Sequence, residues 1–308
     1  MLVSALLSVT CLAQAAITLE QAKTYIDSSM QSLAPLVEQS RLKNILMNVK
    51  VRKDIPYEQR DGVDQSRLSL DLYTKKGVTD NADIPLIVYI HGGGWLGGDK
   101  VLALFKPAEF VSAGYIFASA NYPFRPKSSL LEMAQSVADA VGFLHKEASK
   151  FGADPHCIFL MGHSAGAHLV SVLGTNSIFL NNAGVPMKSI CGVISLDTAA
   201  YDLPALASSS PFHKMVFDGL QSTWLDVSPM QQIPNNMAKT PFLVFFSEGR
   251  IQAATQIIPF VEQLKSVGYP AFIHEAMGRT HDELDKKIGT SADVSTRKIQ
   301  DFLLEFSR

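Results

Sequence analysis

Short apolar runs alternate with longer amphipathic stretches from about residue 85 to the end of the chain. Six of these runs are bounded by turn residues and are predicted as strands, at residues 86–90, 116–120, 157–161, 191–196, 241–246 and 271–275. Brief, continuously apolar strands separated by helical segments are typical of a parallel sheet with helices on both faces. The pattern therefore predicts an α/β fold.

Helical spacing is clearest after Ser129, which forms a predicted capping box with Glu132 and precedes apolar residues at intervals of three or four. A second helical stretch is expected over residues 18–47. Two further strands, around residues 49–52 and 69–73, are predicted to be antiparallel edge strands. Together with the six runs above they give a mostly parallel central sheet of about eight strands.

The 308 residues are 47% hydrophobic, which is enough to bury one large core. We expect a single catalytic domain over residues 16–308 with an N-terminal helical extension. Between two predicted strands, at about residues 202–239, the periodicity fades into a stretch that contains proline and serine. A lid-like insertion that shapes a substrate site is expected there.

The first fifteen residues carry no charge and end in Ala13-Gln14-Ala15, a small-x-small pattern that a signal peptidase could cut. This predicts a cleaved signal peptide and a secreted or periplasmic protein. A membrane anchor is the alternative, but the apolar stretch is far shorter than the roughly 20 residues that span a bilayer. We therefore expect no stable membrane insertion.

Two cysteines, Cys157 and Cys191, follow the predicted signal peptide, each at the start of an apolar run. Export would allow a disulfide between them. Buried free cysteines that act as small apolar side chains are the favoured interpretation, because cysteine is among the most frequently buried residues.

The formal net charge is only −2, and the basic residues are spread along the chain. This excludes the concentrated basic surface of a nucleic-acid-binding protein. A small-molecule partner is expected, and the composition leaves monomer and homodimer open.

The strongest local motif is Gly162-His163-Ser164-Ala165-Gly166, which lies between a predicted strand and a predicted helix. In this context Gly-x-Ser-x-Gly indicates a nucleophile elbow, a tight turn that lifts the serine hydroxyl out of the sheet. Ser164 is the predicted nucleophile.

Three glycines, within His91-Gly92-Gly93-Gly94-Trp95, follow the first parallel strand. They leave backbone N–H groups open to a substrate, and such donors stabilise the negative charge that develops on a carbonyl oxygen during acyl transfer. Gly93, Gly94 and Ala165 are the predicted oxyanion-hole donors. A phosphate-binding loop is the alternative, but the lysine followed by serine or threonine that it requires is missing.

A serine nucleophile needs a base, and His281 is the predicted one because it lies in the loop after the last predicted strand. His163 and His168 are too close to Ser164 in sequence to approach its hydroxyl from the required side. They are expected to be structural, as are the remaining histidines.

These motifs resemble those of the esterase and lipase branch of the α/β-hydrolases related to hormone-sensitive lipase and kynurenine formamidase-like carboxylesterases. The resemblance extends from about residue 55 to the C-terminus, and it includes residues 91–95, 121–123, 151–155, 162–166 and 201–203. It implies the α/β-hydrolase fold, a Ser-His-acid triad, no cofactor and no metal.

The acid of the triad departs from the family's pattern, because Gly249 occupies the position of the usual aspartate. Asp197 is the favoured replacement, since it ends the preceding parallel strand. Glu248 is the main alternative, one residue from the usual position, and Asp202, Asp226 or no acid at all also stay open. The acid's task is to orient the imidazole and stabilise its charged form.

Carboxylic-ester hydrolysis on short- to medium-chain acyl groups, through an acyl-enzyme, is the predicted function. A secreted serine peptidase or amidase is the nearest alternative, because one catalytic frame serves several reactions. A non-catalytic binding protein with a hydrolase fold is the third hypothesis, prompted by Gly249.

Overall fold

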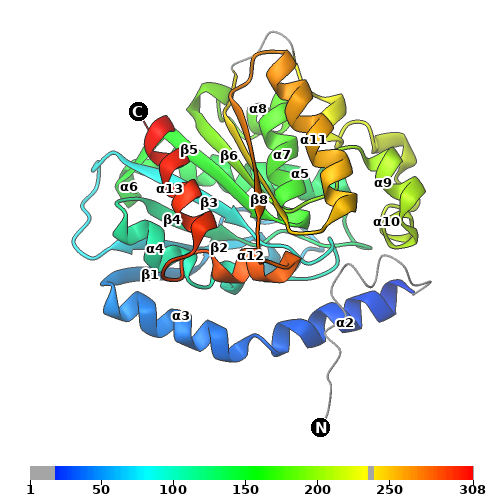
Figure 1. The fold of residues 1–308 in the computed structure, drawn as a ribbon. Helices are drawn as coiled ribbons and strands as arrows, with labels where there is room; N and C mark the ends of the chain where they lie inside the picture. The colour runs from blue at the N-terminus through cyan, green and yellow to red at the C-terminus, as the bar shows by residue number, and fades with distance from the viewer. Residues whose placement is uncertain (1–17, 235–238, 308) are drawn as a thin grey trace.

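An eight-stranded sheet forms the centre of the computed structural model, which describes residues 18–234 and 239–307 (Figure 1). The strand order is β1-β2-β4-β3-β5-β6-β7-β8. The strands are β1 (Val49–Pro56), β2 (Ser69–Lys75), β3 (Ile84–Ile90), β4 (Ile116–Ala120), β5 (Ala153–His163), β6 (Ile190–Leu196), β7 (Phe242–Ser247) and β8 (Ala271–Ala276). The predicted signal peptide, residues 1–15, lies outside the described residues.

Six neighbouring strands, β4, β3, β5, β6, β7 and β8, run parallel to one another, whereas β2 pairs antiparallel with both β1 and β4. The predicted mostly parallel sheet of about eight strands is confirmed. One detail of the prediction is wrong, because of the two antiparallel strands only β1 lies at an edge of the sheet. β2 lies between β1 and β4, where its side chains are buried on both faces as far as Thr74.

The α-helices of the described residues occupy both faces and the rim of the sheet (Figure 1). They are α2 (Leu19–Gln31), α3 (Ala34–Leu46), α4 (Lys106–Ser112), α5 (Leu130–Lys146), α6 (Ala148–Phe151), α7 (Ala165–Thr175), α8 (Ser177–Asn182), α9 (Leu203–Ser209), α10 (Pro211–Val216), α11 (Ile251–Ser266), α12 (His281–Lys287) and α13 (Val294–Phe306).

Two separate hydrophobic cores result from this arrangement. One lies under α5, α7 and α11, and the other lies under α4 and α13. The predicted capping box at the start of α5 is present, since Ser129 Oγ accepts a hydrogen bond from the Glu132 amide and the Glu132 carboxylate accepts one from the Ser129 amide. The sheet is thus buried between the two cores.

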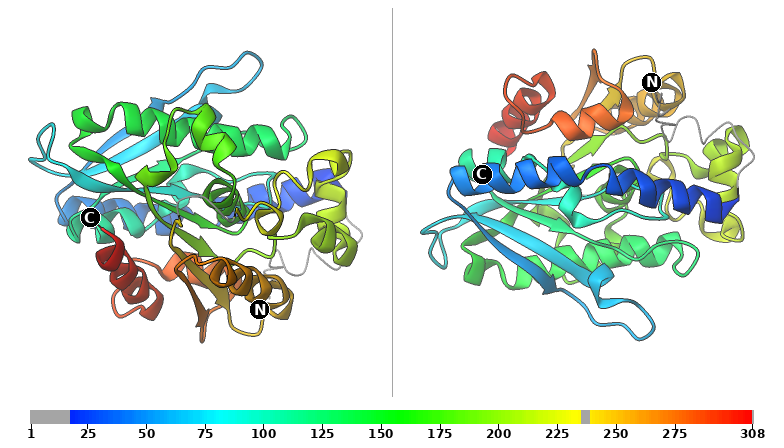
Figure 2. Two further views of the ribbon diagram at one scale, coloured as in Figure 1. Left: turned by 90° about the horizontal axis from the view of Figure 1, so that it is seen from above. Right: turned by 90° about the horizontal axis from the view of Figure 1, so that it is seen from below.

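The predicted N-terminal helical stretch folds as α2 and α3, which run almost end to end. Seen from below, the pair crosses the molecule beside α12, and the start of α2 lies near α9 and α10 (Figure 2, right). Two side chains of α2, Ala22 and Ile26, are buried in the larger core. Helices α2 and α3, here called the N-terminal arm, are therefore packed against the rest of the molecule.

The region between β6 and β7, predicted as a lid-like insertion, contains α9 and α10 followed by short 3-10 turns. Each helix has a proline in its first turn, Pro204 in α9 and Pro211 in α10, where the missing N–H costs nothing. Phe217, just after α10, packs edge to face against Trp95 at a centroid distance of 5.0 Å. The insertion is thereby joined to the glycine-rich loop after β3.

Cys157 on β5 and Cys191 on β6 form a disulfide, with their Cα atoms 5.2 Å apart. The prediction of free cysteines is therefore wrong. The two strands are parallel neighbours, and an irregularity in their register beside Ile158 accompanies the pairing. Sequence spacing alone gives neither the strand order nor this register.

In the described part of the chain, no helix has the length and apolar character that a membrane span requires.

Candidate active site

Ser164 lies in the sharp turn between β5 and α7, with φ of 54° and ψ of −116°. Non-glycine residues rarely adopt a positive φ, and such strain is concentrated at functional sites. The turn requires its glycines, because a Cβ on Gly162 would lie 2.4 Å from the Gly166 carbonyl oxygen, and one on Gly166 would lie 2.1 Å from that of Ile90. The local structure is the predicted nucleophile elbow.

His281 places its Nε2 3.1 Å from Ser164 Oγ. It was predicted in a loop, but it is the first residue of α12, with Thr280 as the N-cap. The Thr280 side chain accepts from the Glu283 amide, and the Glu283 carboxylate accepts from the Thr280 amide, so a capping box fixes the start of this helix. That Thr-x-x-Glu pattern is visible in the sequence and could have predicted the helix.

Asp197 follows β6 directly, and its Oδ2 lies 2.9 Å from His281 Nδ1. The carboxylate is fully buried and also accepts a 2.6 Å hydrogen bond from the Ser247 hydroxyl. Burial raises the pKa of Asp197, but the charge of Arg250 and the contacts with His281 and Ser247 outweigh it and hold the pKa well below its usual range. The carboxylate is therefore ionised at neutral pH.

Glu248, the alternative acid, does not reach His281. Its side chain is exposed, and its Oε2 accepts a hydrogen bond from the Gly278 amide at 2.8 Å. This contact ties the turn after β7 to the turn after β8. Of Asp197 and Glu248, the structure brings only Asp197 to the imidazole.

The glycine-rich loop after β3 lies beside the elbow. Gly93 and Gly94 have φ of 132° and 59°, and a Cβ on Gly93 would lie 2.1 Å from the Gly97 carbonyl oxygen. Among the described residues, no group accepts a hydrogen bond from the amide of either glycine. Ala165 is the first residue of α7, so its amide has no acceptor within the helix. Gly93 shares a cavity with Ser164, whereas Gly94 faces Phe212 of α10.

The two histidines of the elbow have structural contacts. His163 packs against His281 at a ring-centroid distance of 4.6 Å, and its Nε2 lies 3.0 Å from the His281 carbonyl oxygen. His168 accepts from the Trp95 indole at Nδ1, so its Nε2 must donate to the Val227 carbonyl. Burial lowers the pKa of both to about 4, which keeps both rings neutral.

A buried ion pair joins α12 to α4. Lys106 Nζ lies 2.8 Å from Asp285 Oδ1, and Tyr89 donates to the same oxygen at 2.8 Å. Lys106 is completely buried and lies over the Tyr89 ring. The helix that begins with His281 is therefore anchored to β3 and α4.

Arg250 is a site residue that sequence reasoning missed. It is the N-cap of α11, and its Nη1 lies 2.8 Å from Asp197 Oδ1, 2.8 Å from the Asp197 carbonyl oxygen and 2.7 Å from His281 Nδ1. The sequence did offer one signal for Arg250, because it directly follows Gly249, which replaces the aspartate usual in the family.

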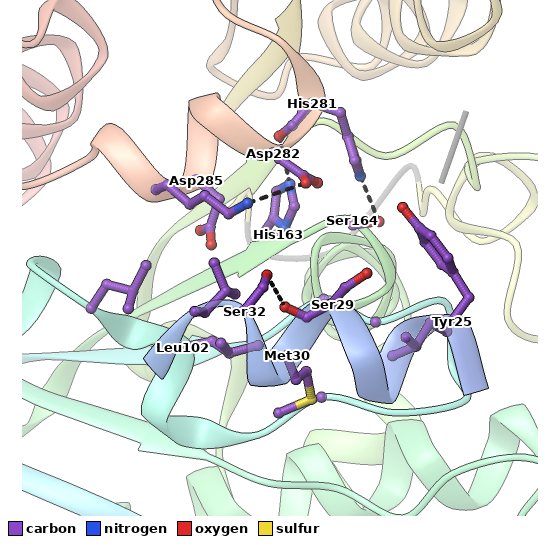
Figure 3. Close-up of a pocket in the computed structure, with 17 residues that line it drawn as sticks. Tyr25, Ser29, Met30, Ser32, Leu102, His163, Ser164, His281, Asp282 and Asp285 are labelled. Atoms are coloured by element: carbon purple, nitrogen blue, oxygen red, sulfur yellow. Dashed lines mark hydrogen bonds and ion pairs between the residues drawn. The ribbon is translucent and has the colours of Figure 1, made fainter. Parts of the chain in front are cut away.

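A cavity of about 110 Å³ lies in front of Ser164 and His281. One wall is α2 and the turn after it, from which Tyr25, Ser29 and Ser32 point toward the two catalytic candidates (Figure 3). Leu33, Leu102 and Leu104 complete an apolar surface, and Asp282, Asp285 and Lys286 line the polar side. The site is therefore built from both the sheet and the N-terminal arm.

Residues 70–197 match the model of the BD-FAE family. The chain is 32% identical over 118 residues to a probable isoprenylcysteine α-carbonyl methylesterase of Arabidopsis thaliana, covering 38% of this chain and 24% of that protein. It is 30% identical over 149 residues to a kynurenine formamidase of Salmo salar, covering 48% and 45%. The chain thus spans about a quarter to a half of the length of these relatives.

Esterase B of Lactobacillus rhamnosis is a similar solved structure, with a TM-score of 0.71 at 19% identity over 94% of this chain and 95% of that one. This similarity confirms the α/β-hydrolase fold. The predicted relation to kynurenine formamidase-like α/β-hydrolases is confirmed by the family match and the relatives.

Proposed function

We propose that this chain, an α/β-hydrolase that carries the BD-FAE domain at residues 70–197, is a serine hydrolase of carboxylic esters. The observation that carries the proposal is the contact series from Ser164 Oγ to His281 Nε2 and from His281 Nδ1 to Asp197 Oδ2. A hydroxyl, an imidazole and a buried carboxylate in this order form the arrangement that activates a serine for acyl transfer.

In the acylation step, His281 carries its proton on Nδ1, where Asp197 accepts it. Ser164 Oγ attacks the ester carbonyl carbon while its own proton passes to His281 Nε2. The carbonyl oxygen becomes negatively charged and accepts hydrogen bonds from the amides of Gly93 and Ala165, with Gly94 as the third predicted donor. The bond to the alcohol oxygen then breaks, and the imidazolium returns its proton to that oxygen.

In the second step, water attacks the acyl group on Ser164. His281 Nε2 takes a proton from the water, and the bond between Oγ and the acyl carbon breaks. The proton then returns to Ser164 Oγ, which leaves the free carboxylic acid and the resting enzyme. Asp197 stays ionised throughout and stabilises the imidazolium in both steps.

The size of the cavity favours esters with acyl groups at the short end of the short- to medium-chain range. An apolar cavity of about 150 Å³ holds one benzene molecule. The 110 Å³ here therefore suits an acyl group of about two to four carbons. The apolar residues Leu33, at the N-cap of α3, and Leu102 line the space that a longer chain would need.

The decisive test is hydrolysis of p-nitrophenyl acetate and butyrate by wild type, Ser164→Ala, Asp197→Asn and Glu248→Gln. Ser164→Ala should be inactive, and Asp197→Asn should lose about 10³- to 10⁴-fold in kcat because the imidazole tautomer is no longer held. Glu248→Gln is the matched carboxylate control and should retain the wild-type rate. An inactive wild type that also resists a fluorophosphonate probe would instead support the binding-protein hypothesis.

An amidase is the second candidate, favoured by the similarity to a kynurenine formamidase. Both reactions share the acyl-enzyme, so the site geometry fits either one. Matched ester and anilide substrates separate them, and a higher kcat/KM for the anilide would replace the esterase proposal by an amidase.

Export from the cytoplasm is also proposed, together with cleavage after Ala15. The Cys157–Cys191 disulfide supports it, because disulfides persist mainly in oxidising compartments. N-terminal sequencing of the protein from fractionated cells tests it. A cytoplasmic protein with an intact first residue would contradict it.

A further inference from the structure

The Asp197–His281 pair has a third partner. Arg250 Nη1 lies within 2.8 Å of Asp197 at two oxygens and 2.7 Å from His281 Nδ1. Asp197 is completely buried, and the Arg250 side chain is only 14% exposed. A guanidinium that is so shielded acts on both groups at a much lower effective dielectric than it would in water.

The contact between Arg250 and His281 constrains the proton of the imidazole. A guanidinium has no acceptor, so its hydrogen bond to Nδ1 requires a bare lone pair on that nitrogen. The proton then sits on Nε2, where His281 donates to Ser164 Oγ and cannot take the serine's proton. The contact with Asp197 Oδ2 requires the opposite arrangement, with the proton on Nδ1 and the lone pair on Nε2.

Nδ1 can satisfy only one of these contacts at a time. Asp197 favours the tautomer that can act as a base, and Arg250 favours the one that cannot. Both groups also affect the charged ring, which Asp197 stabilises and the guanidinium opposes.

We propose that Arg250 is a positioning residue, which sets the tautomer of His281 and opposes the charge that the ring gains when it takes the proton of Ser164. The inference rests on the proposed serine-hydrolase function, and it assigns Arg250 a role that reaches the reaction only through His281. Arg250 also balances the charge of Asp197, which has no second charged partner among the described residues apart from His281.

Other titratable groups surround these three and must be held constant in a test. His163 packs on the His281 ring from β5, and His213 of α10 lies in the field of Arg250. Five charged side chains lie on α12 itself: Asp282, Glu283, Asp285, Lys286 and Lys287. All of them are present in every variant below, so a difference between variants reports on Arg250.

The experiment measures the rate of Ser164 labelling by a fluorophosphonate between pH 5 and 9, because labelling needs the activated serine but no ester substrate. The variants are Arg250→Gln, Arg250→Lys and the control Arg297→Gln, which removes an exposed arginine from α13. Arg250→Gln should move the midpoint of the acid limb upward by about one pH unit. Arg250→Lys should restore most of the wild-type midpoint, because the positive charge is kept, and Arg297→Gln should leave it unchanged.

An Arg250→Gln midpoint equal to that of wild type would overturn the proposal, as would an equal shift in Arg297→Gln. A second measurement needs no variant and no reaction. In ¹⁵N NMR of the histidine rings, neutral wild-type His281 should show protonated Nε2 in part of the population, and a ring protonated on Nδ1 alone would also overturn it. A wild type that takes no label but shows this mixture would count against the proposed function and not against the role of Arg250.

Discussion

Removal of the buried charge on Lys106 tests how α12 is held in place. Lys106→Met keeps most of the side-chain volume but leaves Asp285 without a counterion. In the wild type, burial raises the pKa of Asp285, but Lys106, His163 and Tyr89 outweigh it and hold that pKa below its ordinary value. The variant therefore leaves a buried carboxylate with the Tyr89 hydroxyl as its main partner.

Loss of one partner from a buried ion pair typically costs about 3–5 kcal/mol, most of which is the uncompensated charge that stays behind. Lys106 is 0% exposed and Asp285 7% exposed, so little solvent screening reduces this figure. Replacement of both partners by apolar residues is often nearly neutral. The double variant Lys106→Met/Asp285→Leu should therefore recover most of the stability that the single variant loses.

Urea unfolding at pH 7.5, followed by circular dichroism, measures both free energies of unfolding. Lys106→Met should be less stable than wild type by about 3–5 kcal/mol, and the double variant should lie within about 1–2 kcal/mol of wild type. A single variant as stable as wild type would refute the argument. A double variant no more stable than the single one would show that packing, and not the stranded charge, dominates.

Three further predictions follow from other parts of the molecule. The double variant Cys157→Ser/Cys191→Ser should have a free energy of unfolding in urea about 3–4 kcal/mol lower than wild type, because the disulfide closes a loop with a sequence separation of 34. An unchanged urea midpoint would contradict this. His163 and His168, which are buried beside Ser164, have a pKa of about 4, so below about pH 6.5 the unfolded chain binds more protons than the folded one. The free energy of unfolding should therefore be complete above this pH and fall by about 2 kcal/mol per ring at pH 5. Equal stability at pH 7.5 and pH 5 would contradict this. Leu33→Ala should raise the octanoate-to-butyrate ratio of kcat/KM by about tenfold or more by enlarging the cavity. Leu46→Ala, on the exposed side of α3, is the control and should leave that ratio unchanged.

The fold was largely predictable because its strands are short, apolar and bounded by turns. The predicted run at residues 116–120 coincides with β4, and the other five runs differ from their strands mainly at the ends. The position of Ser164 was equally accessible, since a strand, two glycines and a helix specify the turn locally. Local patterns of this kind depend on neighbouring residues alone.

Features that depend on contacts between distant residues were harder to predict. The disulfide depends on β5 and β6 being neighbours in register, and the choice between Asp197 and Glu248 depends on which strand end faces His281. Arg250 was missed for the same reason, because its partners come from two other strand ends. The start of α12 is different, since its capping box of Thr280 and Glu283 is a local pattern that the sequence shows directly.

The N-terminal arm contributes much of the cavity wall but none of the reacting groups. In the proposed function, binding selectivity and bond cleavage therefore reside in separate stretches of the chain. Substitutions in α2 can change which acyl group fits while the distances among Ser164, His281 and Asp197 stay the same. For a protein engineer, residues 19–33 are thus a compact region in which substrate range can be varied independently of the catalytic chemistry.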